Sequence, residues 1–185
     1  MSMIQEKNGL LVIKGSKFYY VLMFLATVGF LIGCVFLIIN GLKFNSKYSL
    51  FYLGGGILFT PFYLYLTLWS LPGFIPGKIL FKIIPGKGGR VISNKGTVPI
   101  KNIQDISFVR NPLNLINDIV IQTFDDKKIR IRTYNLLDEL VYEMMVDQYI
   151  YPYMHEHAKQ VWDRKINLER LSKEARYERK EPKID

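Results

Sequence analysis

The stretch PGKGGR, residues 85–90, is the part of the sequence that most resembles a phosphate-binding loop. The P-loop of an NTPase carries Gly, four further residues and then Gly-Lys-Ser or Gly-Lys-Thr, between a strand and a helix. Here Gly88 follows Lys87 in place of the hydroxyl residue, and the next segment, RVIS, has the composition of a strand. The sequence therefore predicts a hairpin turn at residues 85–89 and no nucleotide site.

The two histidines of the chain, His155 and His157, flank Glu156. A zinc protease places its histidines four residues apart, so that both reach one metal ion from one helix face. Residues two apart on a helix point in different directions. Asp125 and Asp126 are adjacent in a predicted turn and diverge, unlike a working acid–base pair. We therefore expect no catalytic residue, no metal site and no cofactor, and predict that the protein is not an enzyme.

Two long apolar runs of the chain contain no charged side chain. They are Phe18–Leu42 and Ser49–Gly73, in a chain of 185 residues. Each exceeds the ~20 residues that cross a ~30 Å hydrocarbon core as a helix. The first run is also longer than the apolar region of a signal peptide, which has roughly 7–15 residues. The sequence predicts a transmembrane helical hairpin over residues 18–73, with spans at about 18–42 and 49–71.

The distribution of lysine and arginine orients this hairpin. Three lysines precede the first span, two lie between the spans, and six basic residues follow the second: Lys78, Lys82, Lys87, Arg90, Lys95 and Lys101. Cytoplasmic segments carry the excess of positive charge. We therefore expect a multi-pass protein of the cell membrane with both termini in the cytoplasm and residues 1–17 as a cytoplasmic N-terminal segment.

The basic stretch after the second span has two interpretations. No Asp or Glu occurs between Glu6 and Asp105, and the chain carries a formal charge of +9. The stretch is topogenic, or it also contacts anionic headgroups, where each basic residue is worth about 1 kcal/mol. Lys78 and Lys82 are the candidates for lipid contact closest to the span. We expect the bilayer and an unidentified protein as partners, and no nucleic acid.

Gly29 and Gly33 lie four residues apart on one face of the first span. Small residues let helix backbones approach each other closely in lipid. We expect helix packing at this pair, either between the two spans or between two copies of the chain in a homodimer.

From Lys78 the pattern changes to short β-like segments rich in Val, Ile, Phe and Thr, separated by turn residues. In KIRIR, residues 128–132, the isoleucines face one way and the basic residues the other, as in a half-buried antiparallel strand. Apolar residues at i, i+3 and i+4 over residues 137–145 then predict an amphipathic helix. The sequence thus predicts a β domain with a closing helix over residues 74–155 and a charged helical tail over residues 156–185.

The segments GTVPIKNIQDISF, residues 96–108, and LLDELVYEMM, residues 136–145, resemble bacterial pleckstrin-homology-like membrane proteins with an N-terminal two-helix hairpin. The chain is also similar to uncharacterised small membrane proteins of Bacillus-type bacteria. This resemblance implies a membrane protein of the α+β class, in which a cytoplasmic PH-like antiparallel β-barrel or sandwich is closed by a C-terminal amphipathic helix. It also implies phosphate contact in the first hairpin, at Lys87 and Arg90.

The function expected from these features is binding. We predict a non-catalytic membrane-anchored binding or scaffold protein, whose PH-like domain is presented to a protein partner at the cytoplasmic face. The alternative is an accessory or immunity-type membrane protein, whose hairpin packs against the transmembrane segments of a partner.

Overall fold

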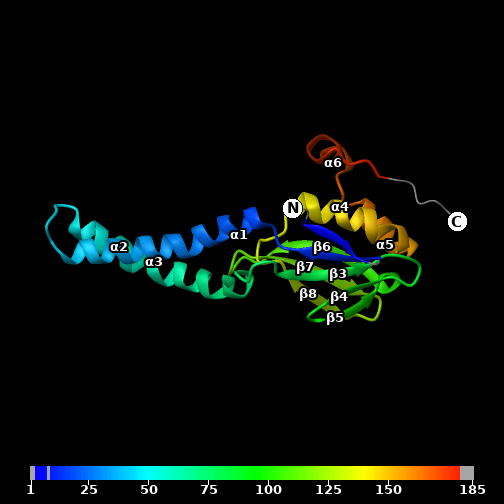
Figure 1. The fold of residues 1–185 in the computed structure, drawn as a ribbon, viewed down its shortest axis with the longest axis horizontal. Coiled ribbons are helices and arrows are strands. Elements are labelled where there is room, and N and C mark those ends of the chain that lie inside the picture. Colours follow the sequence, from blue (N-terminus) through cyan, green and yellow to red (C-terminus); the bar gives the residue numbers. More distant parts are fainter. Residues whose placement is uncertain (1–2, 8, 180–185) are drawn as a thin grey trace.

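A long helical hairpin projects from one end of a β domain, and the helices that follow the last strand cover one side of that domain (Figure 1). The computed structural model describes residues 3–7 and 9–179. The molecule is therefore elongated, with the apolar helices at one end and the charged, folded domain at the other.

Two long helices form the hairpin. The first comprises α1 (Lys17–Phe24), the π-helical turn η1 (Leu25–Gly29) and α2 (Phe30–Leu42). The second is α3 (Ser49–Ser70), which contains Pro61 and continues into the 3₁₀ turn η2 (Leu71–Gly73). Both are long and apolar enough to cross a membrane by length and composition, with mean hydropathies of 2.8 and 1.3. The two predicted long apolar helices near the N-terminus are thus present.

Gly41 and Gly56 bring α2 and α3 together. A Cβ atom at Gly41 would lie 2.6 Å from the backbone nitrogen of Leu53, and one at Gly56 would lie 2.6 Å from Cγ1 of Ile38. Both distances are too short for a side chain, so these two positions require glycine for close helix packing.

Gly29 and Gly33 do not make this contact, which corrects the expectation that the spans pack through them. No heavy atom lies within 4 Å of a Cβ built at Gly33, and at Gly29 the nearest is Cδ2 of Leu25 in the same helix, at 4.0 Å. The close contact between the two helices is made instead by Gly41, near the connecting loop, and by Gly56 of α3. Packing of a second copy against Gly29 and Gly33 stays a prediction.

Within the described residues, eight antiparallel strands form two sheets. The five-stranded sheet has the order β1-β2-β3-β4-β5 and the three-stranded sheet the order β6-β7-β8. The strands are β1 (Ile4–Lys7), β2 (Leu10–Lys14), β3 (Ile79–Ile84), β4 (Arg90–Ser93), β5 (Gly96–Pro99), β6 (Ile103–Arg110), β7 (Asn117–Thr123) and β8 (Lys128–Arg132). The 3₁₀ turn η3 (Ile100–Asn102) links β5 to β6. The expected turn at residues 85–89 joins β3 to β4.

The strands β1 and β2 precede the hairpin in sequence but belong to the same sheet as β3. Lys14 at the end of β2 pairs with Ile79 at the start of β3. Leu11 and Ile13 are buried to 2% and 0% exposure, so this segment contributes directly to the core. Residues 1–17 were predicted to be a separate cytoplasmic segment, whereas residues 10–14 complete the sheet.

The two sheets do not close into a barrel, which corrects one of the two predicted forms, a β-barrel or a sandwich. The strand β8 is the last of its sheet, and β3 pairs with β4 only from Lys82 onward, because β4 has four residues. Both sheets nevertheless contribute to one hydrophobic core, for example through Ile83 of β3 and Ile121 of β7. The domain is therefore a two-layer α+β structure with an open side between β3 and β8.

The predicted closing helix is α4 (Glu139–Tyr149), and its side chains Tyr142 and Met145 lie in the core. Asp138 caps its N-terminus by accepting a hydrogen bond from the backbone of Leu140 at 3.1 Å. The 3₁₀ turn η4 (Tyr151–Tyr153) and the helices α5 (Glu156–Asp163) and α6 (Leu168–Ala175) follow.

The charged C-terminal segment packs on the domain. Ala158 and Trp162 of α5 belong to the core cluster, and Leu171 of α6 is fully buried. The part of the predicted helical tail at residues 180–185 lies outside the described residues.

Candidate functional site

A cleft of about 900 Å³ lies between β3 and β8, at the place where the two sheets do not close. The turn between β4 and β5 forms its third side and reaches across to β8, since a Cβ at Gly96 would lie 3.9 Å from Cδ1 of Ile129. The first residues of β3 have no β4 partner on this side. The cleft therefore follows from the short length of β4 and β5.

Basic side chains line this β3–β8 cleft, and no acidic side chain of the described residues does so. The lining consists of Lys78, Lys82, Lys95, Lys128, Arg130 and Arg132, with Ser93, Asn94, Tyr134 and the apolar residues Ile79, Leu80, Phe81, Ile92 and Ile129. Charges of one sign on the walls of a concave surface add to a positive potential that attracts anions.

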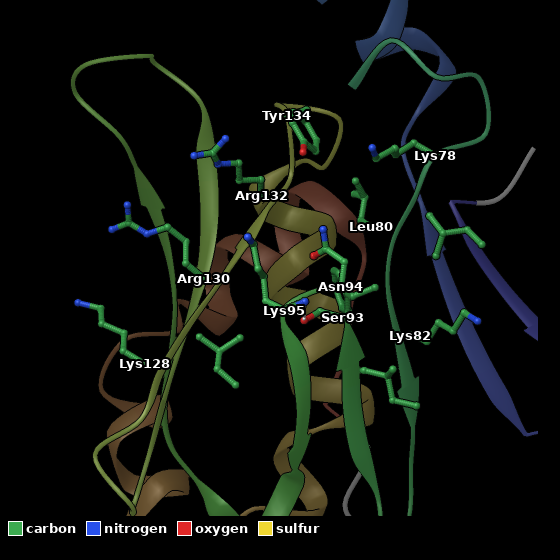
Figure 2. A pocket seen from close by; sticks show the side chains of 14 residues that line it. Lys78, Leu80, Lys82, Ser93, Asn94, Lys95, Lys128, Arg130, Arg132 and Tyr134 are labelled. Atoms are coloured by element: carbon green, nitrogen blue, oxygen red, sulfur yellow. Dashed lines mark hydrogen bonds between the residues drawn. The ribbon is translucent and has the colours of Figure 1, made fainter. Parts of the chain in front are cut away.

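Figure 2 shows how these side chains lie. The amide of Asn94 and the ammonium group of Lys95 point into the gap between the two strands, and Lys78 and Tyr134 lie at one end of it. The other basic groups extend to the outer sides of β3 and β8. The interior thus offers a few hydrogen-bond donors inside a wider positive rim.

The end of the cleft at Lys78 lies against the last residues of α3 and the turn η2. The guanidinium carbon of Arg132 lies 4.4 Å from the centre of the Trp69 ring. The Nζ of Lys78 donates a hydrogen bond to the carbonyl of Pro72 at 2.7 Å and lies 5.1 Å from the centre of the Tyr134 ring. The cleft therefore begins where the hairpin ends.

Asp118 on β7 offsets part of the charge of β8. It pairs with Arg132 across the strands, and its Oδ2 lies 3.6 Å from Nε of Arg130. Burial raises the pKa of the Asp118 carboxyl, and the guanidinium groups of Arg130 and Arg132 lower it in part. Its Oδ1 is buried without a hydrogen-bond partner among the described residues. This carboxylate is thus incompletely satisfied by its basic neighbours.

The structure separates the four basic residues that the sequence analysis proposed for lipid or phosphate contact. Lys78 and Lys82 line the cleft. Lys87 and Arg90 do not line it: Lys87 lies in the turn after β3, and Arg90 pairs with Ile84 at the end of that strand. A phosphate contact at Lys87 and Arg90 stays a prediction.

A second charged region, the Asp147 cluster, comprises Asp147, Trp162, Tyr177, Arg179 and Asp163. The Asp147 side chain is fully buried and accepts hydrogen bonds from Nε1 of Trp162 and Oη of Tyr177, both at 2.9 Å. Arg179 donates two further bonds, at 2.5 and 2.9 Å, and a third to Asp163 at 2.7 Å. Burial and the bond to Asp147 raise the pKa of the Tyr177 phenol. Every charge of this cluster has a partner.

The histidine pair lies at the start of α5. Nδ1 of His155 accepts a hydrogen bond from the backbone nitrogen of His157 at 3.3 Å, so His155 caps the helix. Within residues 3–7 and 9–179, no group of three or more His, Cys, Asp or Glu side chains lies close enough together to hold a metal ion.

Four of the basic residues that line the cleft were not predicted as site residues: Lys95, Lys128, Arg130 and Arg132. The alternation in residues 128–132 did predict that the basic side chains share one face, and Ile131 of that strand is buried at 2% exposure. The missing information was that β8 lies beside β3, which is about 50 residues away in sequence.

Comparisons with known proteins place the chain among bacterial relatives. It is 36% identical over 155 residues to the Bacillus subtilis (strain 168) protein called uncharacterized lipoprotein YfjD, covering 81% of this chain and 84% of that protein. It is 32% identical over 128 residues to uncharacterized protein YfjE of the same strain, covering 66% of this chain and 84% of that protein. No solved structure matches the chain.

One protein-family model matches residues 10–172, from the first residue of β2 into α6, and this region contains the hairpin and every residue of the cleft. The chain therefore belongs to the family of unknown function DUF5381.

Proposed function

We propose that this protein is a non-catalytic binding protein of the cell membrane, which holds its β domain at the cytoplasmic face for a protein partner. The observation that carries the proposal is the attachment of the domain to both ends of the hairpin. The chain leaves the sheet at Lys14 and returns to the neighbouring strand at Ile79. Both ends of the hairpin are therefore on the same side of the bilayer, and the basic residues around them make this side the cytoplasmic one.

Hydrogen bonds hold the domain directly against the spans. The backbone nitrogen of Gly15 donates to the carbonyl of Lys78 at 3.0 Å, and that of Ser16 donates to the carbonyl of Leu136 at 2.9 Å. Oη of Tyr19 donates to Oδ2 of Asp138 at 2.9 Å. A domain fixed in this way is oriented relative to the membrane, which supports presentation of a defined surface rather than flexible tethering.

We infer that the domain is a distant PH-like domain. Antiparallel strands in two layers, followed by a closing helix, support this inference. The open side between β3 and β8 and the two strands before the hairpin are departures from a simple closed barrel.

The name of the relative YfjD describes a lipoprotein, which supports membrane association and raises a different mode of attachment. A bacterial lipoprotein is anchored through a cysteine that becomes the first residue after the signal segment is removed. Cys34 is the one cysteine of this chain, and it lies buried in α2. Cleavage before it would remove β2 and its buried residues from the sheet. We therefore propose attachment through the two helices rather than through a lipid on Cys34.

Cysteine labelling in intact cells tests the orientation. In a Cys34→Ser background, a Ser46→Cys variant places a thiol in the loop between α2 and α3, and an Asp126→Cys variant places one in the turn between β7 and β8. A membrane-impermeant maleimide should label the first variant in intact cells and the second only after lysis. Labelling of Asp126→Cys in intact cells, or a mature chain that lacks residues 1–33, would contradict the proposal.

Photo-crosslinking of the full chain in native membranes then identifies the partner. The full chain is required, because a fragment that begins at Lys78 lacks β1 and β2. We expect crosslinks from exposed positions of the β domain to one recurring protein.

One observation favours the accessory or immunity-type alternative: the space beside Gly29 and Gly33 is open in the described structure, so a partner helix fits there. In that case a Gly29→Leu/Gly33→Leu variant should abolish crosslinks from the hairpin to the partner. Gly54→Leu on the second span is the matched control, since its surroundings are also open. Unchanged crosslinking in the double variant would remove this alternative.

A further inference from the structure

We propose that the β3–β8 cleft is a binding site for a phosphate group, which is supplied by the headgroup of an anionic lipid in the leaflet around the spans. This inference rests on the proposed membrane attachment, because only an anchored domain keeps the cleft beside the headgroups. It concerns a set of residues different from Lys87 and Arg90 of the first hairpin.

The charge of the cleft is the first argument. Six of its fourteen lining residues are basic and none is acidic. Within the described residues, no salt bridge involves Lys82, Lys95 or Lys128, whereas Lys159, Lys165, Arg170 and Arg179 elsewhere in the domain all have carboxylate partners. Gathering unpaired charges of one sign destabilises a fold through repulsion. A bound anion would offset that repulsion.

The donors of the cleft suit a phosphate. The ammonium group of Lys95 and the amide of Asn94 point into the gap, and the hydroxyl group of Tyr134 lies at one end of it (Figure 2). These groups supply several N–H and O–H donors around one space, and a phosphate offers acceptor oxygens in several directions. The apolar side of the cleft, for example Leu80, can contact the glycerol part of a lipid.

The position of the cleft beside the end of the hairpin favours a lipid as the source of the phosphate group. Tryptophan rings gather at the headgroup level of a membrane, and Trp69 at the end of the second span contacts Arg132 of the cleft. Lys78 at the same end is hydrogen-bonded to the carbonyl of Pro72 just after that span. A headgroup phosphate is therefore within reach of the cleft without any movement of the domain. A binding site for an acidic peptide would not need to lie beside the end of the hairpin.

The test uses the full chain in neutral detergent micelles, with native mass spectrometry as the readout of bound lipid. Short-chain phosphatidylglycerol is the probe, phosphatidylcholine with the same chains is the zwitterionic comparison, and inorganic phosphate is the soluble competitor. The cleft variant is Lys95→Gln/Lys128→Gln, and the matched control is Lys101→Gln/Lys173→Gln, whose exposed lysines lie outside the cleft and outside the first hairpin.

We expect phosphatidylglycerol to bind in preference to phosphatidylcholine. The cleft variant should lose roughly 25-fold in affinity, because each of its two basic residues near an anionic lipid contributes about fivefold. The control should keep the affinity of the unmodified chain, and Lys95→Arg/Lys128→Arg should retain most of it. Equal melting temperatures of the variants would show that folding is unchanged.

Each other outcome has a defined meaning. Displacement of the lipid by inorganic phosphate at comparable concentrations, with loss of both ligands in the cleft variant, would support the phosphate site and assign it to a soluble phosphate. Equal affinity of cleft and control variants would overturn the site, as would displacement of the lipid by an acidic peptide alone. The cysteine labelling is independent of these results, so a failed cleft is distinguishable from a failed membrane orientation.

Discussion

The Asp147 cluster and the β3–β8 cleft are both rich in charge, yet their charges are satisfied in opposite ways. In the cluster, one buried carboxylate accepts hydrogen bonds from three side chains, and Arg179 is shared between two carboxylates. In the cleft, none of the four lysines takes part in a salt bridge of the described residues, and the nearby carboxylate of Asp118 retains an oxygen without a hydrogen-bond partner there.

This difference separates charge that stabilises the fold from charge that is available to a ligand. Removing one partner of a buried ion pair leaves an uncompensated charge and costs several kcal/mol, whereas exposed charges contribute little. The comparison therefore predicts that substitutions in the cluster alter stability and that substitutions in the cleft alter binding.

The largest effect is expected for Asp147→Ala. The substitution leaves Arg179, Tyr177 and the indole of Trp162 without their common acceptor, so the free energy of unfolding should fall by about 3–5 kcal/mol. Denaturant unfolding of the full chain in detergent, followed by tryptophan fluorescence, measures this change. Asp163→Ala is the control, because its carboxylate is 43% exposed and its loss should cost about 1 kcal/mol or less. Equal losses for the two variants would contradict the distinction.

Asp118→Asn should change the pH dependence of stability. Because the pKa of Asp118 is raised above 3.8, the folded chain binds more protons than the unfolded chain between 3.8 and the raised value. The contribution of Asp118 to the free energy of unfolding therefore falls as pH rises through this window. The variant should gain stability relative to the unmodified chain over the same window, by at most the roughly 1–3 kcal/mol of an unpaired buried acceptor.

Unfolding free energies measured from pH 4 to pH 7 test this prediction. Asp126→Asn in the exposed β7–β8 turn removes the same charge and should run parallel to the unmodified chain. Parallel curves for Asp118→Asn as well would refute the expected role of burial.

Arg132→Lys probes the contact between the cleft and the second span. Lysine keeps the charge but loses the planar group that lies over the Trp69 ring, so about 0.5–1 kcal/mol of stability should be lost. Thermal unfolding in micelles measures the loss, with Arg110→Lys at the end of β6 as the comparison. An equal change in both variants would show that the ring contact contributes nothing.

The smallest stability effect is expected for Lys95→Gln/Lys128→Gln. Surface substitutions away from packed or paired groups stay within about 0.5 kcal/mol, and relief of repulsion favours a slight gain. The same variant should lose most of its phosphatidylglycerol binding. A large loss of stability would show that these lysines stabilise the folded state, and it would contradict the predicted difference from Asp147.

The hairpin and the strands from β3 to β8 could be predicted from the sequence, because each is encoded locally. Charge-free runs of over 20 residues and turn residues between β-branched segments need no knowledge of the rest of the fold. The strands β1 and β2 carry a similar local signal, since Asn8-Gly9 between apolar segments is typical of a tight hairpin turn. The lysines around this segment were interpreted only as signals of membrane orientation.

The cleft could not be predicted, because it depends on which strands become neighbours. Lys78 was selected by its position beside the span, and this residue does line the cleft. Lys95 and Lys128 join it only because β4 and β5 are short and β8 is an edge strand. Packing of the spans was assigned to the wrong glycines for a related reason: the sequence shows spacing on one helix but not the register of the second.

The pairing of β2 with β3 across the hairpin sets the order in which the sheet can form. A two-stranded hairpin alone is marginally stable in water, so β1 and β2 gain their third strand only after both long helices have been synthesised. Only then does β3 leave the ribosome and bring Ile79 beside Lys14. Under the proposed membrane attachment, a chain whose second helix fails to insert cannot pair β2 with β3, and its β domain would stay unfolded and accessible to proteases.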